Sequence, residues 1–260
     1  MIRHLWKHRE LIWQFTLRNV ELRHRGSHLG LAWSFLNPLL MLGLYFFVFG
    51  YIFGGRFANE SRAEYALGIF LGLTIFHMVA EVMSAAPVVI VTNPNFVKKV
   101  VFPLEVLPLA HVGSAVFHLL TSLILVILGV VTIGPGLSVG VLWLPVILFP
   151  LVLTVFGIAW FFAALGVFLR DVSQIMQFLS MALLYASAIF YPSSLIPHAA
   201  WLVLRLNPLL LAVEMARNAV LWQQPVNLNH LIYLYPCGIL SCYLGYLAFR
   251  CMKPAFSDVL

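Results

Sequence analysis

The stretch LPLAHVGSAVFHLLTSLILVILGVVTI, residues 107–133, contains no Asp, Glu, Lys or Arg and is long enough to cross a bilayer as a helix. Its apolar residues are continuous rather than alternating, which favours a helix over a barrel strand. Similar runs occur along the rest of the chain. The sequence therefore predicts an all-α polytopic membrane protein, a single transmembrane domain over residues 1–260, with six transmembrane helices at residues 30–53, 65–91, 107–133, 141–168, 175–191 and 231–249.

The composition supports this fold class. Of the 260 residues 62% are hydrophobic and only 9% are charged, with a mean hydropathy of +0.98, whereas about a quarter of an average soluble protein is charged. A soluble enzyme, a nucleic-acid-binding protein and a disordered protein are therefore excluded. The net charge of +6 comes from short segments between apolar runs and not from one basic patch. The three cysteines form no C-x-x-C pair, so neither a disulfide nor a zinc framework is predicted.

Residues 195–222 are apolar enough to form a seventh span, but prolines divide them. Asn207 suits a helix cap and Pro208 suits the first turn of a new helix. We therefore expect two short re-entrant helices in one leaflet. With six spans, eleven of the 15 Lys and Arg residues fall on one side and four on the other. The positive-inside rule then places both termini in the cytoplasm.

Residues 1–28 form a basic arm ahead of the first span. An apolar stripe that includes Trp6, Trp13 and Val20 follows helical spacing, and Arg18 belongs to the opposite face. A basic amphipathic helix with two tryptophans is predicted to lie flat in the membrane interface. The alternative is a helix packed on a partner protein.

Two predicted cytoplasmic loops could contact another protein. Residues 93–103 should form a short helix, with a capping asparagine and a proline at its start and a second proline at its end. It displays apolar residues beside Lys98 and Lys99, as a helix that docks in a groove does; an interfacial helix on lipid is the alternative. The second loop is tight and contains Arg170 and Asp171, which could pair with each other or with a docked partner.

No catalytic or metal-binding pattern is found. The sequence has no G-x-S-x-G and no H-E-x-x-H, and none of its four lysines follows a glycine as in a Walker A loop. ATP-driven action would therefore require an ATPase on another chain. Glu81 is the one acid deep in a span, and we expect it to be structural or pore-facing. A single such acid argues against a proton-coupled carrier. His77, His111 and His118 are expected to pack between helices or to line a water-filled cavity.

Aromatic residues cluster in spans one and five. Most should face lipid or the interface, but a subset facing a channel would suit sugars, whose C–H faces stack on aromatic rings. The candidate channel-lining residues are Tyr45, Phe46, Phe49, Phe178, Tyr185 and Tyr191.

Several ordered stretches together resemble one family, the membrane subunits of ABC-2 type exporters of cell-surface polysaccharides such as O-antigen, capsule and teichoic acid. The chain departs from it slightly, with Asn-Pro-Asn at the start of the 93–103 segment and Leu104 where a charged residue is common. The matching stretches are RHRGSHLGLAWSFLNPL (23–39), NPNFVKKVVFPLEVLP (93–108), FLRDVSQI (168–175), IFYP (189–192), LIP (195–197) and LNPL (206–209).

The resemblance implies a homodimer in the bacterial inner membrane, bound to two copies of a separate ATPase that holds the ATP and Mg. This chain would have no catalytic site, no cofactor and no nucleic-acid partner. The substrate would be a lipid-linked O-antigen polysaccharide that passes through a channel at the dimer interface, surrounded by membrane lipid. The alternative within the same family is export of a capsular polysaccharide or teichoic acid. Three further alternatives rank below it: a drug exporter, an ion-coupled carrier of a small molecule, and a glycosyltransferase.

The resemblance also assigns residues to roles. Arg23 and Arg25 are placed to attract a lipid diphosphate, although ordinary positive-inside anchoring explains them equally well. The contact with the ATPase would use Asn95, Phe96, Lys98, Lys99, Arg170 and Asp171, and the outer gate would use Pro197, Asn207 and Pro208.

Overall fold

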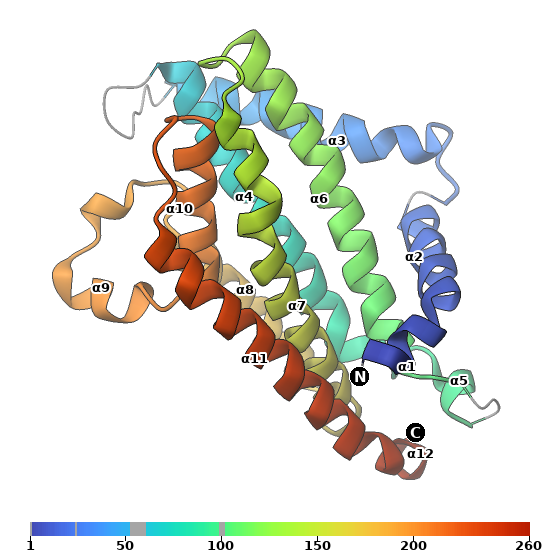
Figure 1. Ribbon diagram of the computed structural model, residues 1–260. Helices are drawn as coiled ribbons and strands as arrows, with labels where there is room; N and C mark the ends of the chain where they lie inside the picture. The colour runs from blue at the N-terminus through green and yellow to red at the C-terminus, as the bar shows by residue number, and fades with distance from the viewer. Residues whose placement is uncertain (1, 24, 53–60, 99–101) are drawn as a thin grey trace.

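The computed structural model of the chain describes residues 2–23, 25–52, 61–98 and 102–260, and every regular element in these ranges is a helix (Figure 1). The predicted contact residue Lys99 and the end of the first predicted span at residue 53 lie outside them. The α-helices are α1 (Ile2–Lys7), α2 (Arg9–Arg23), α3 (Trp33–Tyr45), α4 (Arg62–Ala85), α5 (Pro94–Lys98), α6 (Val106–Thr132), α7 (Trp143–Phe168), α8 (Val172–Ala186), α9 (His198–Leu204), α10 (Pro208–Val220), α11 (Leu228–Met252) and α12 (Phe256–Val259).

Among the residues that the structure describes, five helical stretches are long and apolar enough to cross a membrane, and the bent pair α9 and α10 would raise the number to six if it forms one span. This confirms the predicted all-helical, multi-span fold class. Five of the six predicted spans correspond to the five long stretches, which are Gly30–Ile52, Arg62–Val88, Val106–Thr132, Val139–Phe168 and Leu228–Val259.

The span predicted at residues 175–191 differs from the structure. Its helix, α8, has 15 residues and ends at Ala186, so it is ~22 Å long and shorter than a bilayer core. Ala188 follows with a φ of 49°, a backbone conformation that an L-residue in a helix does not adopt. The apolar composition of residues 187–191 suggested a longer helix, but their backbone turns away from its axis.

Helix α4 is the centre of the bundle, with α6, α7, α8 and α10 packed around it (Figure 1). It begins at a capping box, in which the Ser61 hydroxyl accepts from the Glu64 amide and the Glu64 carboxylate accepts from the Ser61 amide. In its most apolar window 83% of the residues are buried. Helix α4 is thus apolar on all its sides because other helices of the protein surround it.

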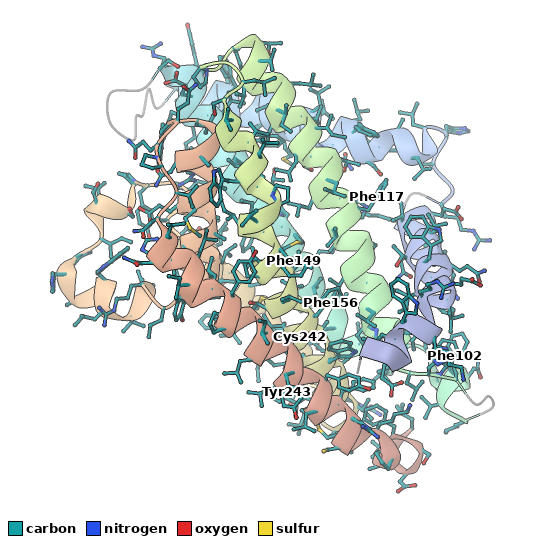
Figure 2. All side chains as sticks on the ribbon, viewed as in Figure 1. Phe102, Phe117, Phe149, Phe156, Cys242 and Tyr243 are labelled. Atoms are coloured by element: carbon teal, nitrogen blue, oxygen red, sulfur yellow. The ribbon has the colours of Figure 1, made fainter. Side chains whose placement is uncertain are left out.

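The closest helix pair is α7 with α11, and glycines make the approach possible. A Cβ atom added at Gly157, Gly238 or Gly245 would overlap backbone atoms of the opposite helix. Phe156 and Cys242 mark the two helices along this contact in Figure 2. Small residues at such a contact allow the van der Waals packing that holds helices together in a membrane.

The segment predicted to be re-entrant, residues 195–222, is bent at the predicted position. Helices α9 and α10 meet at 100°, and Asn207 and Pro208 form the bend: the Asn207 side chain accepts from the Leu209 amide and Pro208 is the first residue of α10. The Asn207 amide also donates to the Ala186 carbonyl at 3.2 Å, which ties the start of α10 to the end of α8.

The N-terminal arm consists of α1 and α2, and α2 lies along α6 (Figure 1). Thr16 and Val20 are buried, whereas Trp6 and Trp13 expose 69% and 62% of their surface. The predicted apolar stripe is thus divided, because Val20 faces the bundle and the two tryptophans face outward. One face of the arm packs on protein, and the tryptophans remain available to an interface.

Candidate functional site

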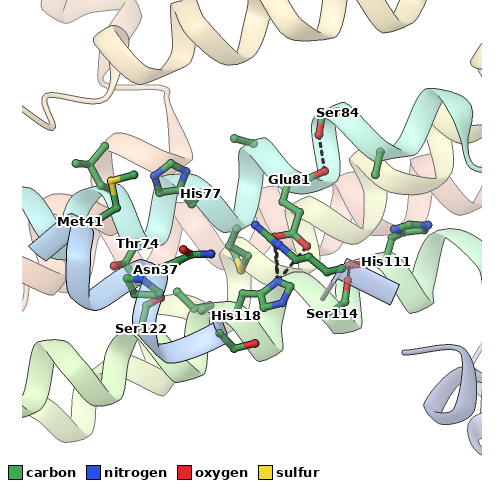
Figure 3. A pocket seen from close by; sticks show the side chains of 18 of the residues that line it. Asn37, Met41, Thr74, His77, Glu81, Ser84, His111, Ser114, His118 and Ser122 are labelled. Carbon is green, nitrogen blue, oxygen red and sulfur yellow. Dashed lines mark hydrogen bonds and ion pairs between the residues drawn. The ribbon is translucent and has the colours of Figure 1, made fainter. Parts of the chain in front are cut away.

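A cavity of about 1070 Å³ lies where α2 and α3 meet α4, α6 and α8 (Figure 3). The helix α3 covers it only loosely, because just 6% of the residues in the most apolar window of its span are buried. Apolar surface makes up most of the lining, but many of the lining residues carry polar side chains. The polar and aromatic side chains of the lining are Asn19, Arg23, Trp33, Ser34, Asn37, Tyr45, Phe70, Thr74, His77, Glu81, Ser84, His111, Ser114, His118, Ser122, Gln177 and Ser180.

Three ionisable side chains from three helices meet in this cavity. The Arg23 guanidinium at the end of α2 donates from Nη1 to Glu81 Oε2 at 2.7 Å. His118 Nδ1 lies 3.1 Å from both Glu81 oxygens and 2.8 Å from Arg23 Nη1. Figure 3 shows Glu81 and His118 facing each other across the cavity. An intramembrane carboxylate is thus compensated by a cation delivered from the arm.

The protonation of His118 determines how this group is bonded. With a proton on Nδ1, the imidazole donates to Glu81; without one, Nδ1 accepts from Arg23. In both cases Glu81 lies between the guanidinium and the imidazole. The Arg23 side chain is 51% exposed, the Glu81 side chain 26% and the His118 side chain 17%. The guanidinium therefore lies on the exposed side of the carboxylate and the imidazole.

Aromatic rings join the middle of α2 to α5. Phe96 of α5 lies 4.5 Å from Phe102 between ring centroids, and Phe15 of α2 lies 5.7 Å from Phe96 and 5.4 Å from Phe102. Figure 2 shows Phe102 at the α5 end of the molecule. Phe15, Phe96 and Phe102, called here the aromatic trio, therefore connect α2, α5 and the start of α6.

The C-terminal segment also reaches α5. Lys98 Nζ donates to the carbonyl of Leu260, and Phe256 of α12 is fully buried against Phe249. Nearby, Lys253 Nζ lies 3.0 Å from each carboxylate oxygen of Glu105, whose side chain is 6% exposed. The start of α6, the end of α11 and α5 are thus held together by polar contacts.

A second cavity, of about 670 Å³, lies among α4, α10 and the segment after α8. Arg217 is 3% exposed beside it. Its guanidinium donates to the carbonyls of Gly68 and Ala188 at 2.8 Å and of Ile189 at 2.5 Å. Arg217 therefore holds the irregular end of α8 against α4 and α10.

The sequence of residues 10–221 matches the family described as ABC-2 type transporter. This match covers most of the chain. The chain belongs to the ABC-2 transporter family.

Curated relatives of this ABC-2 protein align over nearly its full length. It is 28% identical to an O-antigen export system permease protein RfbA of Klebsiella pneumoniae, over 96% of this chain and 95% of the relative. It is 27% identical to the RfbA permease of Myxococcus xanthus, over 80% and 79% of the two chains. It is 24% identical to the polysialic acid transport protein KpsM of Escherichia coli, over 92% of each chain.

In this ABC-2 protein the predicted channel aromatics are divided among three environments. Tyr45 lines the cavity. Phe49 and Tyr191 are half-buried against the core: Phe49 stacks on Phe190 at 5.6 Å, and the Tyr191 hydroxyl donates to the Tyr185 carbonyl at 2.6 Å. Three face outward, with exposures of 41% for Phe46, 73% for Phe178 and 56% for Tyr185.

The predicted ATPase-contact residues are also divided. Asn95, Lys98, Arg170 and Asp171 are exposed, but Phe96 packs in the aromatic trio and is half-buried. No ion pair joins Arg170 to Asp171 in the part of the chain that the structure describes. Bonding of this pair to a docked partner stays a prediction.

The predicted diphosphate residues lie in different surroundings. Arg23 is bonded to Glu81, so its charge is compensated within the chain, whereas Arg25 is exposed on the loop that follows α2. At the predicted gate, Pro197 precedes the first residue of α9, and Asn207 and Pro208 form the bend.

Sequence reasoning missed the contacts of two ionisable residues. Arg217 lies in the apolar run 195–222, and a charged residue in such a run is itself a signal of a functional contact. Glu105 gave no signal, because its partner Lys253 is 148 residues away.

Proposed function

We propose that this chain is the membrane subunit of a polysaccharide exporter of the bacterial inner membrane, in which a separate ATPase provides the energy. The observation that carries the proposal is the end-to-end similarity to permeases named for O-antigen export. A lipid-linked O-antigen polysaccharide is the substrate we propose.

The chemistry of the large cavity suits a sugar chain. Hydroxyl, amide and imidazole groups such as those of Ser122, Asn37 and His77 can exchange hydrogen bonds with sugar hydroxyls, and Trp33 and Tyr45 offer rings for the C–H faces. A long polymer cannot be enclosed in one cavity of this size. We therefore propose that two copies of the chain place their cavities along one conduit.

The outward-facing aromatics fit this arrangement. Phe46 of the first span and Phe178 and Tyr185 of α8 belong to helices that border the cavity. In a homodimer that joins these helices, their exposed rings would cover the conduit or line it. In the single chain they would face lipid.

The ATPase is proposed to dock at the end of the bundle that carries α5. Asn95, Lys98, Arg170 and Asp171 are exposed there on two loops that both precede membrane helices. ATP and Mg would be bound by that partner, two copies of which would serve the dimer. Arg25, exposed at the entry to the first span, is the better placed of the two predicted arginines to attract a lipid diphosphate.

Export of a capsular polysaccharide is the second candidate, favoured by the alignment with KpsM over 92% of each chain. The two candidates share one mechanism and differ in the polymer. Ion-coupled carriage is a weaker alternative, because the intramembrane acid Glu81 already forms an ion pair.

Reconstitution with the ATPase encoded by a neighbouring gene tests the proposal. The two proteins should co-purify, and lipid-linked polysaccharide should stimulate ATP hydrolysis and be transported in proteoliposomes. Exchanging Arg170 for Glu should weaken co-purification, whereas Arg205→Glu, at an exposed arginine directly after α9 and far from α5 (Figure 1), should not. Transport by the chain alone, or the absence of any bound ATPase, would refute the proposal.

A further inference from the structure

Helix α2 contacts both regions that the proposed function requires to communicate. The middle of the helix, at Phe15, meets the segment that carries α5, where we propose that the ATPase docks, and its C-terminal end, at Arg23, meets the cavity. Helix α2 also lies along α6. The inference below rests on the proposed function and concerns how hydrolysis reaches the cavity.

The contact between α2 and α5 is made by the aromatic trio. Phe15 touches both Phe96 and Phe102, and the three centroid distances are all under 6 Å. Rings at such distances interact favourably beyond the area that they bury. A displacement of α5 by a docked ATPase must therefore either break this contact or carry Phe15 with it.

Next to Phe15, at Thr16, α2 and α6 approach closely. A Cβ added at Gly113 would lie 2.5 Å from Thr16 Oγ1 and 2.9 Å from Thr16 Cγ2. Thr16 itself is buried, and its hydroxyl donates to the Ile12 carbonyl within α2. Because Gly113 has no side chain, α2 lies directly on the α6 backbone and can tilt or slide over it.

At the cavity end, the contact is the ion pair of Arg23 with Glu81, supported by His118. This contact is polar and the Arg23 side chain is 51% exposed, so water or a ligand that enters the cavity can take the place of the guanidinium. The aromatic trio is apolar, whereas water can replace the ion pair at the cavity. We therefore expect movement of α2 to break the Arg23–Glu81 ion pair and to leave the contact between Phe15 and α5 intact.

We propose that α2 is the mechanical link between α5 and the cavity, in which Phe15 holds the link to α5 and the Arg23–Glu81 pair closes the cavity until α2 moves. Phe15 and Arg23 are thus positioning residues for transport. Loss of Phe15 disconnects the cavity from the ATPase, and loss of Arg23 leaves the cavity open in every nucleotide state.

The test measures cavity access in the complete complex with its ATPase. The native cysteines Cys237, Cys242 and Cys251 are replaced with Ser, and Ser122→Cys provides a single thiol in the cavity lining. A charged methanethiosulfonate reagent then reports access as a labelling rate, with and without ATP and vanadate. In the parent complex the rate should change with nucleotide.

Two variants and their controls separate the roles. Arg23→Gln should raise the nucleotide-free labelling rate about twofold to fivefold and abolish its response, and Arg205→Gln, at an exposed arginine with no assigned contact to the cavity, should leave both unchanged. Phe15→Ala should retain ATP hydrolysis but lose the response, and the exposed Trp13→Ala should keep it. If Arg23→Gln and Phe15→Ala respond to nucleotide as the parent does, the link is refuted while the proposed function stands.

A compensating pair protects the test against variants that merely fold badly. Gly113→Ala should reduce the response because its methyl group collides with Thr16, and adding Thr16→Ala should restore it. Failure of restoration in a well-folded double variant counts against the role of this contact. A parent complex whose labelling ignores nucleotide would overturn the link and, together with absent transport, the proposed function as well.

Discussion

Replacing Arg217 with Met should destabilise the protein more than any other single exchange of a basic residue in the re-entrant segment. The guanidinium is 3% exposed and donates to three backbone carbonyls. Methionine has similar length and apolar character but no donor. The exchange therefore removes the hydrogen bonds and leaves the packing volume nearly intact.

The magnitude follows from what becomes of each carbonyl. Gly68 lies inside α4, so its oxygen retains a partner within the helix. Ala188 and Ile189 lie in irregular backbone and are 5% and 0% exposed, and the described residues offer their carbonyls no other hydrogen bond. A buried acceptor left without a partner costs about 1–3 kcal/mol, so the two together cost about 2–6 kcal/mol.

The assay is thermal denaturation of the purified protein in detergent, followed by loss of the monodisperse chromatographic peak. A loss of this size should lower the midpoint by roughly 5–20 °C. Arg217→Lys, which keeps the charge but cannot reach three carbonyls, should fall between the parent and Arg217→Met. Arg205→Met, at an exposed arginine of the same segment, should shift the midpoint by less than about 2 °C.

An Arg217→Met protein with the midpoint of the parent would refute the reasoning, because it would mean that the end of α8 is held by packing alone. If that variant yields no folded protein, Arg217→Lys decides. A midpoint for Arg217→Lys equal to that of the parent would show that charge, and not the three-carbonyl geometry, is what matters.

Three further outcomes are expected. Gly245→Ala should lower the free energy of unfolding by about 1–3 kcal/mol, because the added methyl group separates α7 from α11. Gly43→Ala, with open space around it, should be tolerated. Equal melting midpoints for the two variants would contradict the packing argument. Lys253→Met should destabilise the protein more than Glu105→Gln, because it leaves the carboxylate of Glu105, the more deeply buried partner, charged and without its cation. The reverse order in the same melting assay would show that the carboxylate is hydrated. A reporter fused after Gly136 should be found outside the cell membrane and one fused at the C-terminus inside, and a C-terminal reporter found outside would require a different number of spans.

The long helices and the bend could be predicted because their signals are local. An uncharged run longer than a bilayer is thick can only be satisfied by a helix. Asn207 followed by Pro208 supplies a cap and a first residue within two positions, and the structure bends there by 100°. The end of α8 could not be predicted, because Asn207 and Arg217, which hold it, lie 20–30 residues farther along the chain.

The candidate site was predictable as a set of residues but not as an arrangement. Arg23, Glu81 and His118 each attracted notice in the sequence, as a basic residue at a span entry, an intramembrane acid and a histidine in an apolar run. Their separations of 37, 58 and 95 residues leave no local signal that they meet. Pairing Arg23 with Glu81 changes the interpretation of both, because a compensated arginine is a weaker anion site and a compensated acid is a weaker proton carrier.

Two kinds of contact hold this bundle together, and they differ in how they respond to force and to water. The α7–α11 pair is joined by backbone packing at Gly157 and Gly245, and no ligand or water molecule can replace such contacts. The end of α2 is joined to the core through Arg23, whose half-exposed side chain can exchange its hydrogen bond to Glu81 for one to water. A transporter that must open without dissociating needs both kinds of contact, so we expect α7 and α11 to stay fixed while α2 moves.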